Sequence, residues 1–390
     1  MRPGLSTRPG ALTPPLALRS VRAADSRSVP AAALMLAVLL WTVGCGEVTP
    51  PITTCEASGG LEPICGFQNP EDLALLPDGH TLVVSQFGAM DGARPGNLAV
   101  FDTVGRQLRV VFRGGGEAPV EGWGEADCPG PPDEAFAPHG LDLAPSSDGR
   151  LQLLVVNHGG REAIEFFEVV PAGLDTRIEW RGCAIPPDDS YLNDVVATPE
   201  GGLLTTHMLP KSAETLSILR GSLLGSDTGW IYEWTREGGW KRLPGTDAPF
   251  PNGIDLSSDA RTIFVNVYLG GEVRRIDRRT GEVTGRVAVS GPDNMTWSSD
   301  GRLLLVASHH AGIRDSMNCM SLTEGSCGFA FEIVAIDPET LERRTVVANE
   351  GPPMGAATVA LQVGNDLWLG TFAGDRVTRV VGGAPTQPTR

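Results

Sequence analysis

The stretch Pro138–Gly160 reads PHGLDLAPSSDGRLQLLVVNHGG, and it indicates the fold of the whole chain. It consists of an apolar segment, the turn sequence SSDG and a second apolar segment, which is the pattern of a β-hairpin. Two of the six histidines of the chain, His139 and His158, stand near its two ends. Because the second strand of a hairpin returns alongside the first, the two histidines are expected to meet.

Five further stretches repeat this pattern, with starts separated by 68, 54, 59, 41 and 64 residues. Each interval leaves room for about two more strands, such as GNLAVFDT or AIEFFEVV. A repeating unit of four antiparallel strands is typical of a propeller blade. The chain is therefore predicted to be all-β, a six-bladed β-propeller with four-stranded antiparallel blades around a central channel. The six stretches begin at Glu71, His139, Asn193, Asn252, Asp293 and Ala357.

Two β-sandwiches are the alternative architecture, but they do not explain why polar residues recur at one phase of the repeat. In a propeller, the first strands line the channel and their first residues meet at one end of the axis. Taken singly, an Asn or Asp before a strand is most often a turn residue. Taken together, these starts are rich in carboxylates and carboxamides and hold no Lys or Arg.

Such a set of buried acidic groups requires compensation, because uncompensated buried charge is strongly unfavourable. Calcium accepts six to eight carboxylate, amide and water oxygens, and Asn is an unusual ligand for zinc. The sequence therefore predicts a calcium site at one end of the channel. The return strands are expected to bring further side chains to the same mouth, and His80 to lie at the opposite end. These mouth residues are Gln86, His158, His207, Tyr268 and His309.

Composition excludes several classes of protein. A net charge of -16 makes binding to nucleic acid or to an anionic membrane surface unfavourable. Residues 1–44 carry five arginines before the apolar run VPAAALMLAVLLWTVG, which is typical of an export signal. The sequence TVGC resembles a bacterial lipobox and predicts lipidation of Cys45, with plain secretion as the alternative. We expect a protein of the bacterial cell envelope, lipid-anchored in the outer membrane or periplasm, or a secreted one.

The remainder of the chain is expected to divide into a linker at 45–62, the propeller at 63–383 and a disordered tail at 384–390. Six cysteines follow Cys45, and an even number in an exported protein suggests disulfides. Six cysteines allow 15 pairings, so the sequence alone leaves the connectivity open. The preferred set is Cys55–Cys65, Cys128–Cys183 and Cys319–Cys327.

The repeats resemble the paraoxonase/arylesterase family, which comprises calcium-dependent lactonases and esterases on six-bladed propellers. The segments that carry the resemblance span roughly residues 65 to 375, and their order is more specific than any one of them. Related gluconolactonase/regucalcin and strictosidine-synthase-like propellers share the blade pattern but lack the paired histidines. The segments are NPEDLALLPDG, APHGLDL, LLVVNH, LNDVVA, FPNGIDLSSD, DNMTWSSDG and TVALQVGNDLWLGT.

The resemblance implies roles for individual residues. His139 and His158 match the family's histidine dyad, and Phe250 matches an aromatic wall position. His207 and His309 are further residues expected in the pocket. Two calcium ions are implied. Ligands of the catalytic ion are Glu71, Asn193, Asn252, Asp293 and Asn294, and those of the structural ion are Asp72, Asp194 and the backbone carbonyl of Leu141.

The sequence also departs from the family. No cysteine follows Cys327, so a disulfide joining the terminal strands has no counterpart. His207 stands where relatives have an acidic or amide group, which puts a proton relay through that position in doubt. The segments 114–134 and 314–327 are particular to this chain and are expected to shape the pocket, with Trp123 and Met208 among its apolar residues.

The predicted function is calcium-dependent hydrolysis of lactones or aryl esters, in which the metal polarises the carbonyl and His139 activates water. His158 would orient His139 or pass on its proton. The chain contains no G-x-S-x-G, Walker, HExxH or dinucleotide motif. A gluconolactonase-like sugar lactonase and a non-catalytic, calcium-stabilised binding propeller are the alternatives. The expected partner is a small lactone or ester, with no nucleic acid, membrane contact only through the lipid anchor, and a monomeric state.

Overall fold

The structure, a computed structural model, describes residues 49–90, 92–117, 122–146, 148–214 and 225–385. The chain divides at residue 47 into two compact units, and the following concerns the unit Val48–Arg390. The predicted export signal, the predicted lipidation site Cys45 and residues 386–390 of the predicted tail lie outside the described residues. Within the described ranges, no helix has the length and apolarity needed to cross a membrane.

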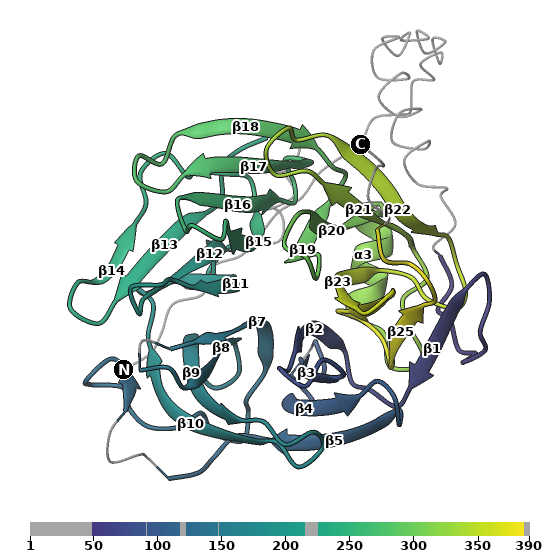
Figure 1. Cartoon of the computed structure of the whole chain (residues 1–390), viewed down its shortest axis with the longest axis horizontal. Helices are drawn as coiled ribbons and strands as arrows, with labels where there is room; N and C mark the ends of the chain where they lie inside the picture. The colour runs from purple at the N-terminus through teal and green to yellow at the C-terminus, as the bar shows by residue number, and fades with distance from the viewer. Residues whose placement is uncertain (1–48, 91, 118–121, 147, 215–224, 386–390) are drawn as a thin grey trace, which may run out of the picture. The chain divides into compact units, whose positions relative to one another are not determined.

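Six antiparallel sheets follow one another around a central axis (Figure 1). In every sheet, the strand that comes first along its repeat lies innermost. Each inner strand contacts the inner strands of both neighbouring sheets, which closes the ring around the axis. The predicted fold, an all-β six-bladed propeller with four-stranded antiparallel blades, is confirmed.

The first three blades follow the chain from residue 70 to residue 242. Blade 1 comprises β2 (Pro70–Leu75), β3 (Thr81–Gln86), β4 (Asn97–Asp102) and β5 (Gln107–Phe112). Blade 2 comprises β7 (Pro138–Pro145), β8 (Leu151–Asn157), β9 (Ala163–Val170) and β10 (Arg177–Ala184), with the short β6 (Trp123–Gly124) as a fifth, parallel strand. Blade 3 comprises β11 (Ser190–Ala197), β12 (Leu203–Pro210), β13 (Trp230–Thr235) and β14 (Gly239–Arg242).

The last three blades complete the ring, and the final one takes a strand from the beginning of the unit. Blade 4 comprises β15 (Pro251–Leu256), β16 (Thr262–Val267), β17 (Glu272–Asp277) and β18 (Val283–Ala288). Blade 5 comprises β19 (Pro292–Trp297), β20 (Leu304–His310), β21 (Ala330–Ile336) and β22 (Arg343–Asn349). Blade 6 comprises β23 (Ala357–Val363), β24 (Asp366–Thr371), β25 (Arg376–Val380) and β1 (Leu61–Cys65). Helix α3 (Ile313–Met320) covers the first part of the segment 314–327, which was expected to shape the pocket.

The hydrophobic core lies between blades, and this explains the continuous apolar runs of the second strands. Side chains alternate between the two faces of a strand. In β8, Leu153 and Val155 pack in the cluster shared with blade 1, whereas Leu154 and Val156 pack in the cluster shared with blade 3. Both faces of such a strand are therefore buried, which favours apolar residues on both.

Pairing of β1 with β25 closes the ring, since it joins the two ends of the propeller in one sheet. The side chain of Arg376 is fully buried and donates to the carbonyl oxygens of Ile52, Thr54 and Pro353. The propeller thus begins at Leu61, two residues before the expected boundary. The described part of the expected linker packs on it, because Arg376 and a bridge between Ile52 and Ser326 hold that segment.

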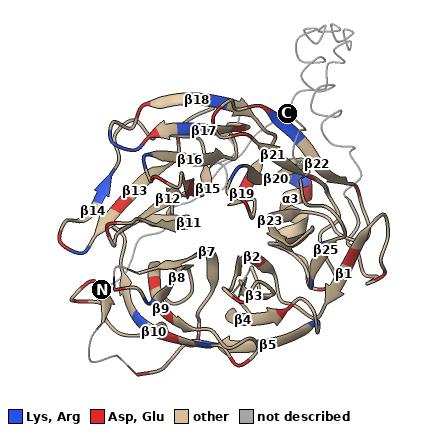
Figure 2. Ribbon diagram, viewed as in Figure 1, with Lys and Arg blue, Asp and Glu red and all other residues tan. Residues whose placement is uncertain are grey.

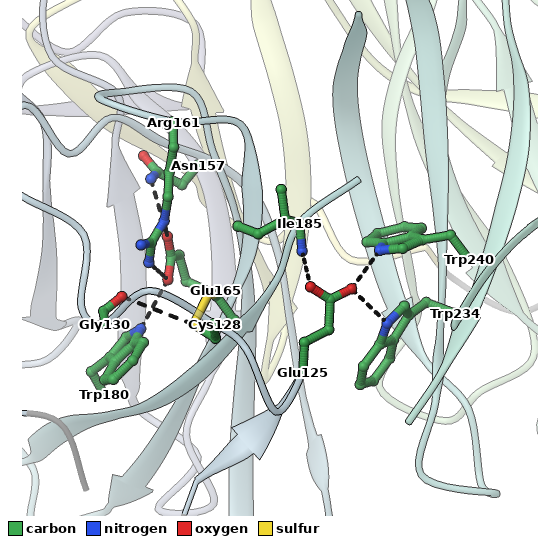
Figure 3. The surroundings of a disulfide bond; sticks show 11 residues. Glu125, Cys128, Gly130, Asn157, Arg161, Glu165, Trp180, Ile185, Trp234 and Trp240 are labelled. Atoms are coloured by element: carbon green, nitrogen blue, oxygen red, sulfur yellow. Dashed lines mark hydrogen bonds and ion pairs between the residues drawn. A yellow bond between two sulfur atoms is a disulfide. The ribbon is translucent and has the colours of Figure 1, made fainter. Parts of the chain in front are cut away.

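Three disulfides join Cys55 to Cys65, Cys128 to Cys183 and Cys319 to Cys327, which confirms the preferred connectivity. Disulfides are typical of proteins exported to an oxidising compartment. Cys128–Cys183 fastens the inserted segment before β7 to the edge of blade 2 (Figure 3). In the same segment, Glu125 accepts hydrogen bonds from the indole N–H groups of Trp234 and Trp240 (Figure 3).

These contacts place part of the insertion on the outer strands of blades 2 and 3. Trp123 pairs with Gly182 of β10, and the guanidinium of Arg150 lies 4.7 Å from the centre of its ring. The expectation that Trp123 lines the pocket is therefore wrong. The parallel pairing of β6 with β10 holds this side chain at the outer edge of the blade instead.

Candidate active site and metal centre

A β-bulge interrupts every inner strand at the position of the predicted site residues. In blade 2, Pro138 pairs with Asn157 and the next regular pair is Leu141 with Val155, so His139 and Gly140 fall in the irregular step. Bulges bend a strand and re-aim its side chains. Consecutive residues can therefore both face the axis. The same step contains Glu71, Asn193 and Asp194, Asn252, Asp293 and Asn294, and Thr358 in the other blades.

Two glycines in these bulges allow neighbouring inner strands to approach closely. A Cβ atom on Gly140 would lie 2.5 Å from Oδ1 of Asp194 in blade 3. A Cβ atom on Gly253 would lie 2.6 Å from the carbonyl oxygen of Asp293 in blade 5. Both separations are below van der Waals contact, so the HG and NG dipeptides at the repeat starts are required by the narrow channel.

The predicted catalytic calcium ligands converge from four blades. Nδ2 of Asn294 donates to Oε1 of Glu71 at 2.8 Å, and Nδ2 of Asn193 lies 3.2 Å from Sδ of Met208. A hydrogen bond from Asn252 to the carboxylate of Asp293 joins blades 4 and 5. Each carboxamide thus turns its nitrogen toward a protein partner.

Four buried oxygens of this set are left without a hydrogen-bond partner. They are Oε2 of Glu71 and the Oδ1 atoms of Asn193, Asn252 and Asn294. An unpaired buried acceptor costs about 1–3 kcal/mol, so four at one place need an explanation. Oxygen atoms of carboxylates and carboxamides are ligands suited to calcium. Among the described residues, no three His, Cys, Asp or Glu side chains form a metal-binding group, and the set depends on its asparagines.

The electrostatics of the channel favour a cation. Burial, followed by repulsion from Asp72 and Asp293, raises the pKa of Glu71 well above its usual value. Burial also raises the pKa of Asp293 to about 7. No Lys or Arg lies on an inner strand, and the acidic residues of β2 are drawn in red beside the axis (Figure 2). A bound cation would neutralise this charge and fits the residues present.

The residues predicted to hold a second, structural calcium have a different environment. Both oxygens of Asp72 accept backbone N–H bonds, from Leu73 and from Leu141 of the next blade. Both oxygens of Asp194 likewise accept bonds from Val195 and Ile254. These carboxylates link neighbouring blades, and none of their oxygens is an unpaired acceptor. A second ion therefore stays a prediction that rests on the resemblance alone.

The hairpin brings the two histidines together. Nε2 of His158 lies 3.0 Å from Nδ1 of His139, and Nε2 of His139 lies 3.6 Å from Oε1 of Glu71. Burial, with a smaller contribution from His158, lowers the pKa of His139 well below its usual value. His139 is therefore neutral at pH 7, as a general base must be.

The ring of His158 is held on several sides. Its Nδ1 lies 3.0 Å from both carboxylate oxygens of Glu162, and the ring stacks on Tyr191 with centroids 4.3 Å apart. Phe87 packs against both imidazoles. The sequence analysis did not identify Glu162 or Tyr191. The spacing His-x3-Glu across two glycines was the available signal, but only the loop conformation gives it meaning.

The other predicted mouth residues lie near the site with different partners. His309 is buried, with Nε2 2.8 Å from the carbonyl oxygen of Ala357 and Nδ1 3.1 Å from the hydroxyl of Tyr268. The ring of His207 packs on Trp230, with centroids 4.3 Å apart, and does not join the histidine pair.

Phe250 precedes β15, contacts Tyr268, and has a left-handed backbone with φ of 62°. Left-handed backbone is uncommon for a bulky side chain. Gln86 ends β3 at the same end of its hairpin, whereas His80 lies in the turn at the other end.

The comparisons with known proteins concern the fold. No protein-family model matches the sequence, and no curated protein matches it. A solved luciferin-regenerating enzyme superposes with a TM-score of 0.51 at 14% identity, over 82% of this chain and 94% of that one. At this identity the likeness shows a shared fold alone.

Two other solved structures are more distant in shape. A gluconolactonase from Xanthomonas campestris has a TM-score of 0.49 at 16% identity, over 86% of this chain and 98% of that one. A calcium-binding regucalcin from Agrobacterium tumefaciens has a TM-score of 0.46 at 14% identity, over 81% and 90%. The resemblance to paraoxonases in particular stays a prediction.

Proposed function

We propose that the protein is a calcium-dependent lactone hydrolase. The observation that carries this proposal is the convergence of four unpaired buried oxygens, from Glu71, Asn193, Asn252 and Asn294, beside a hydrogen-bonded histidine pair. These residues and Asp293 would hold the ion. When bound, calcium would polarise the substrate carbonyl and stabilise negative charge on its oxygen. The remaining steps belong to side chains of this chain.

His139 is the proposed general base. Its Nδ1 is engaged with His158, so its Nε2 is the nitrogen that faces Glu71 and the ligand set. Nε2 of His139 takes a proton from a water molecule while the water oxygen bonds to the carbonyl carbon and the carbonyl π pair moves to its oxygen. When that pair returns, the bond from carbon to the leaving oxygen breaks, and this oxygen takes the proton back from His139.

The surroundings of the histidine pair support apolar lactones and aryl esters over sugar lactones. Phe87 lies against both rings, Tyr191 stacks on His158, and Phe250 contacts Tyr268 at the same end of the propeller. Aromatic side chains bind apolar groups by excluding water. A sugar lactone presents several hydroxyl groups, which need polar partners instead.

A substrate panel tests the proposal. Aliphatic lactones, aryl esters and glucono-lactone are assayed in a pH-stat, with calcium present and after exhaustive chelation. We expect turnover of the first two classes in calcium and none after chelation. Full activity after chelation would remove the metal from the proposal. Calcium binding without turnover of any substrate would favour a binding propeller, and preference for glucono-lactone would favour a sugar lactonase.

A further inference from the structure

The loop between β8 and β9 brings a carboxylate to the histidine pair. Glu162 is the last residue before β9, and its side chain is only 9% exposed. Both of its oxygens lie 3.0 Å from Nδ1 of His158. Its Oε1 also accepts the backbone N–H of Leu192 at 2.7 Å, and Nζ of Lys211 lies 3.6 Å from its Oε2.

These contacts set the direction of the hydrogen-bond chain. An ionised carboxylate can only accept, so Nδ1 of His158 must carry the proton. In the neutral ring, Nε2 of His158 is then an acceptor, and Nδ1 of His139 must donate to it across 3.0 Å. The remaining nitrogen, Nε2 of His139, is consequently left with a free lone pair. This is the atom that lies 3.6 Å from Glu71.

We propose that Glu162 is a positioning residue of the active site, which fixes the tautomers of His158 and His139 so that the basic nitrogen of His139 faces the reacting carbonyl. The assignment rests on the proposed function for its catalytic consequence, but the tautomers themselves do not depend on turnover. A carboxylate that orients a catalytic imidazole, and stabilises the cation formed when that imidazole takes a proton, is a recurring arrangement.

Glu162 also supplies a carboxylate to the histidine pair although position 207, acidic or amide in the related family, is a histidine here. His207 lies against Trp230 and its Nδ1 is 3.4 Å from the backbone nitrogen of Tyr191, so it contacts neither histidine of the pair. The carboxylate comes from blade 2 itself. Because it also binds the N–H of Leu192, which precedes Asn193, it links the histidine pair to a proposed ligand in blade 3.

The variants Glu162→Gln and Glu162→Ala test this assignment in the calcium-loaded, full-length protein. Gln keeps an oxygen that can accept from His158 and Leu192 but removes the charge, whereas Ala removes both. We expect kcat on an aliphatic lactone to fall by about 10- to 100-fold in the Ala variant, and by less in the Gln variant, with KM nearly unchanged. The Glu168→Gln variant is the matched control, because Glu168 lies in β9 and, among the residues that the structure describes, forms its ion pairs with Arg150 and Arg181.

Imidazole nitrogen NMR of histidine-labelled protein reports the tautomers directly. If Glu162 had only a structural role, its replacement would leave these signals unchanged. The wild type and Glu168→Gln should show His158 and His139 protonated at Nδ1. Glu162→Ala should lose this pattern, and Glu162→Gln should keep most of it. Wild-type tautomers in a folded Ala variant, or an unchanged kcat, would overturn the assignment. If the Ala variant fails to fold, Glu162→Leu, which likewise offers no acceptor to His158, takes its place, and wild-type tautomers or an unchanged kcat in that variant overturn the assignment.

The two proposals fail in different ways. If neither the wild type nor any variant hydrolyses a lactone or ester, the proposed function is wrong, while the tautomer pattern still decides the role of Glu162. If the wild type is active and the tautomers of His158 and His139 are unchanged in Glu162→Ala, the proposed function stands and the positioning role is wrong.

Discussion

Nδ2 of Asn294 in blade 5 donates to Oε1 of Glu71 in blade 1 across 2.8 Å, although 223 residues separate the two. This bond turns Oδ1 of Asn294 away from Glu71 and leaves it buried without a partner, as is Oε2 of Glu71 itself. The closed ring of blades thus creates two acceptors that only a donor or a cation can satisfy. The first two predictions follow from this pair.

Replacing Asn294 with Asp should make stability depend more strongly on calcium. The change removes the donor to Glu71 and adds a carboxylate beside Glu71 and Asp293, whose pKa values burial already raises. In chelator, we expect a loss of at least about 1–3 kcal/mol in the free energy of unfolding, and most of this loss should disappear in calcium. Asn365→Asp, in an exposed turn, is the control. Equal destabilisation with and without calcium would contradict a ligand role for Asn294.

Removal of calcium should lower the melting temperature and the hydrolytic rate together. A ligand that binds only the folded state at 100 times its Kd stabilises that state by about 2.7 kcal/mol, which corresponds to several degrees in a domain of this kind. Calorimetry across a calcium titration, with magnesium as the comparison, measures this effect. A melting temperature that is indifferent to calcium would contradict the metal centre.

The variant His139→Gln should lose activity while it keeps its calcium. Gln preserves the approximate size of the side chain but cannot take a proton, and removal of a general base costs about 10²- to 10⁴-fold in rate. Activity on the lactone panel and calcium affinity by isothermal titration calorimetry are measured on the same preparation. Wild-type rates on every substrate would show that the histidine pair is not catalytic.

The disulfide of the insertion should stabilise the fold without affecting the site. Cys128–Cys183 spans 55 residues and Cys55–Cys65 spans 10. Loop entropy predicts losses of about 4 and about 3 kcal/mol for the paired alanine variants. Urea unfolding gives the two values, and we expect activity to persist because Cys128 lies on the outer strands. The entropy argument fails if the shorter loop contributes clearly more.

Arg376 should be among the residues most important to ring closure. Its side chain is fully buried, and Met in its place would leave the carbonyl oxygens of Thr54 and Pro353 without this donor. Because each buried acceptor left unpaired costs about 1–3 kcal/mol, we expect a loss of about 2–6 kcal/mol in the free energy of unfolding. Arg379 lies on the same strand as Arg376 and forms a partly exposed ion pair with Asp366. The variant Arg379→Met should therefore cost about 1 kcal/mol or less. Similar losses for both would contradict this role.

The sequence by itself determined the number of blades, the order of their strands and the pairing of the histidines. Short apolar segments mark the strands, and turn sequences mark where strands end, so both signals are local properties of the sequence. The hairpin from Pro138 to Gly160 therefore predicted that His139 and His158 meet. The three disulfides were also predicted, but the spacing of the cysteines could not prove them.

Only the tertiary structure decided which polar atoms of these residues lack a hydrogen-bond partner. Bulges aim consecutive side chains at the axis, and Gly140 and Gly253, which lie in two of them, allow neighbouring inner strands to approach closely. Whether the oxygen of Asn294 is buried and unpaired depends on Glu71 at the far end of the chain. The contact of Glu162 with His158 likewise depends on the loop conformation. Such contacts arise from packing between segments distant in sequence or from loop geometry, and no local pattern encodes them.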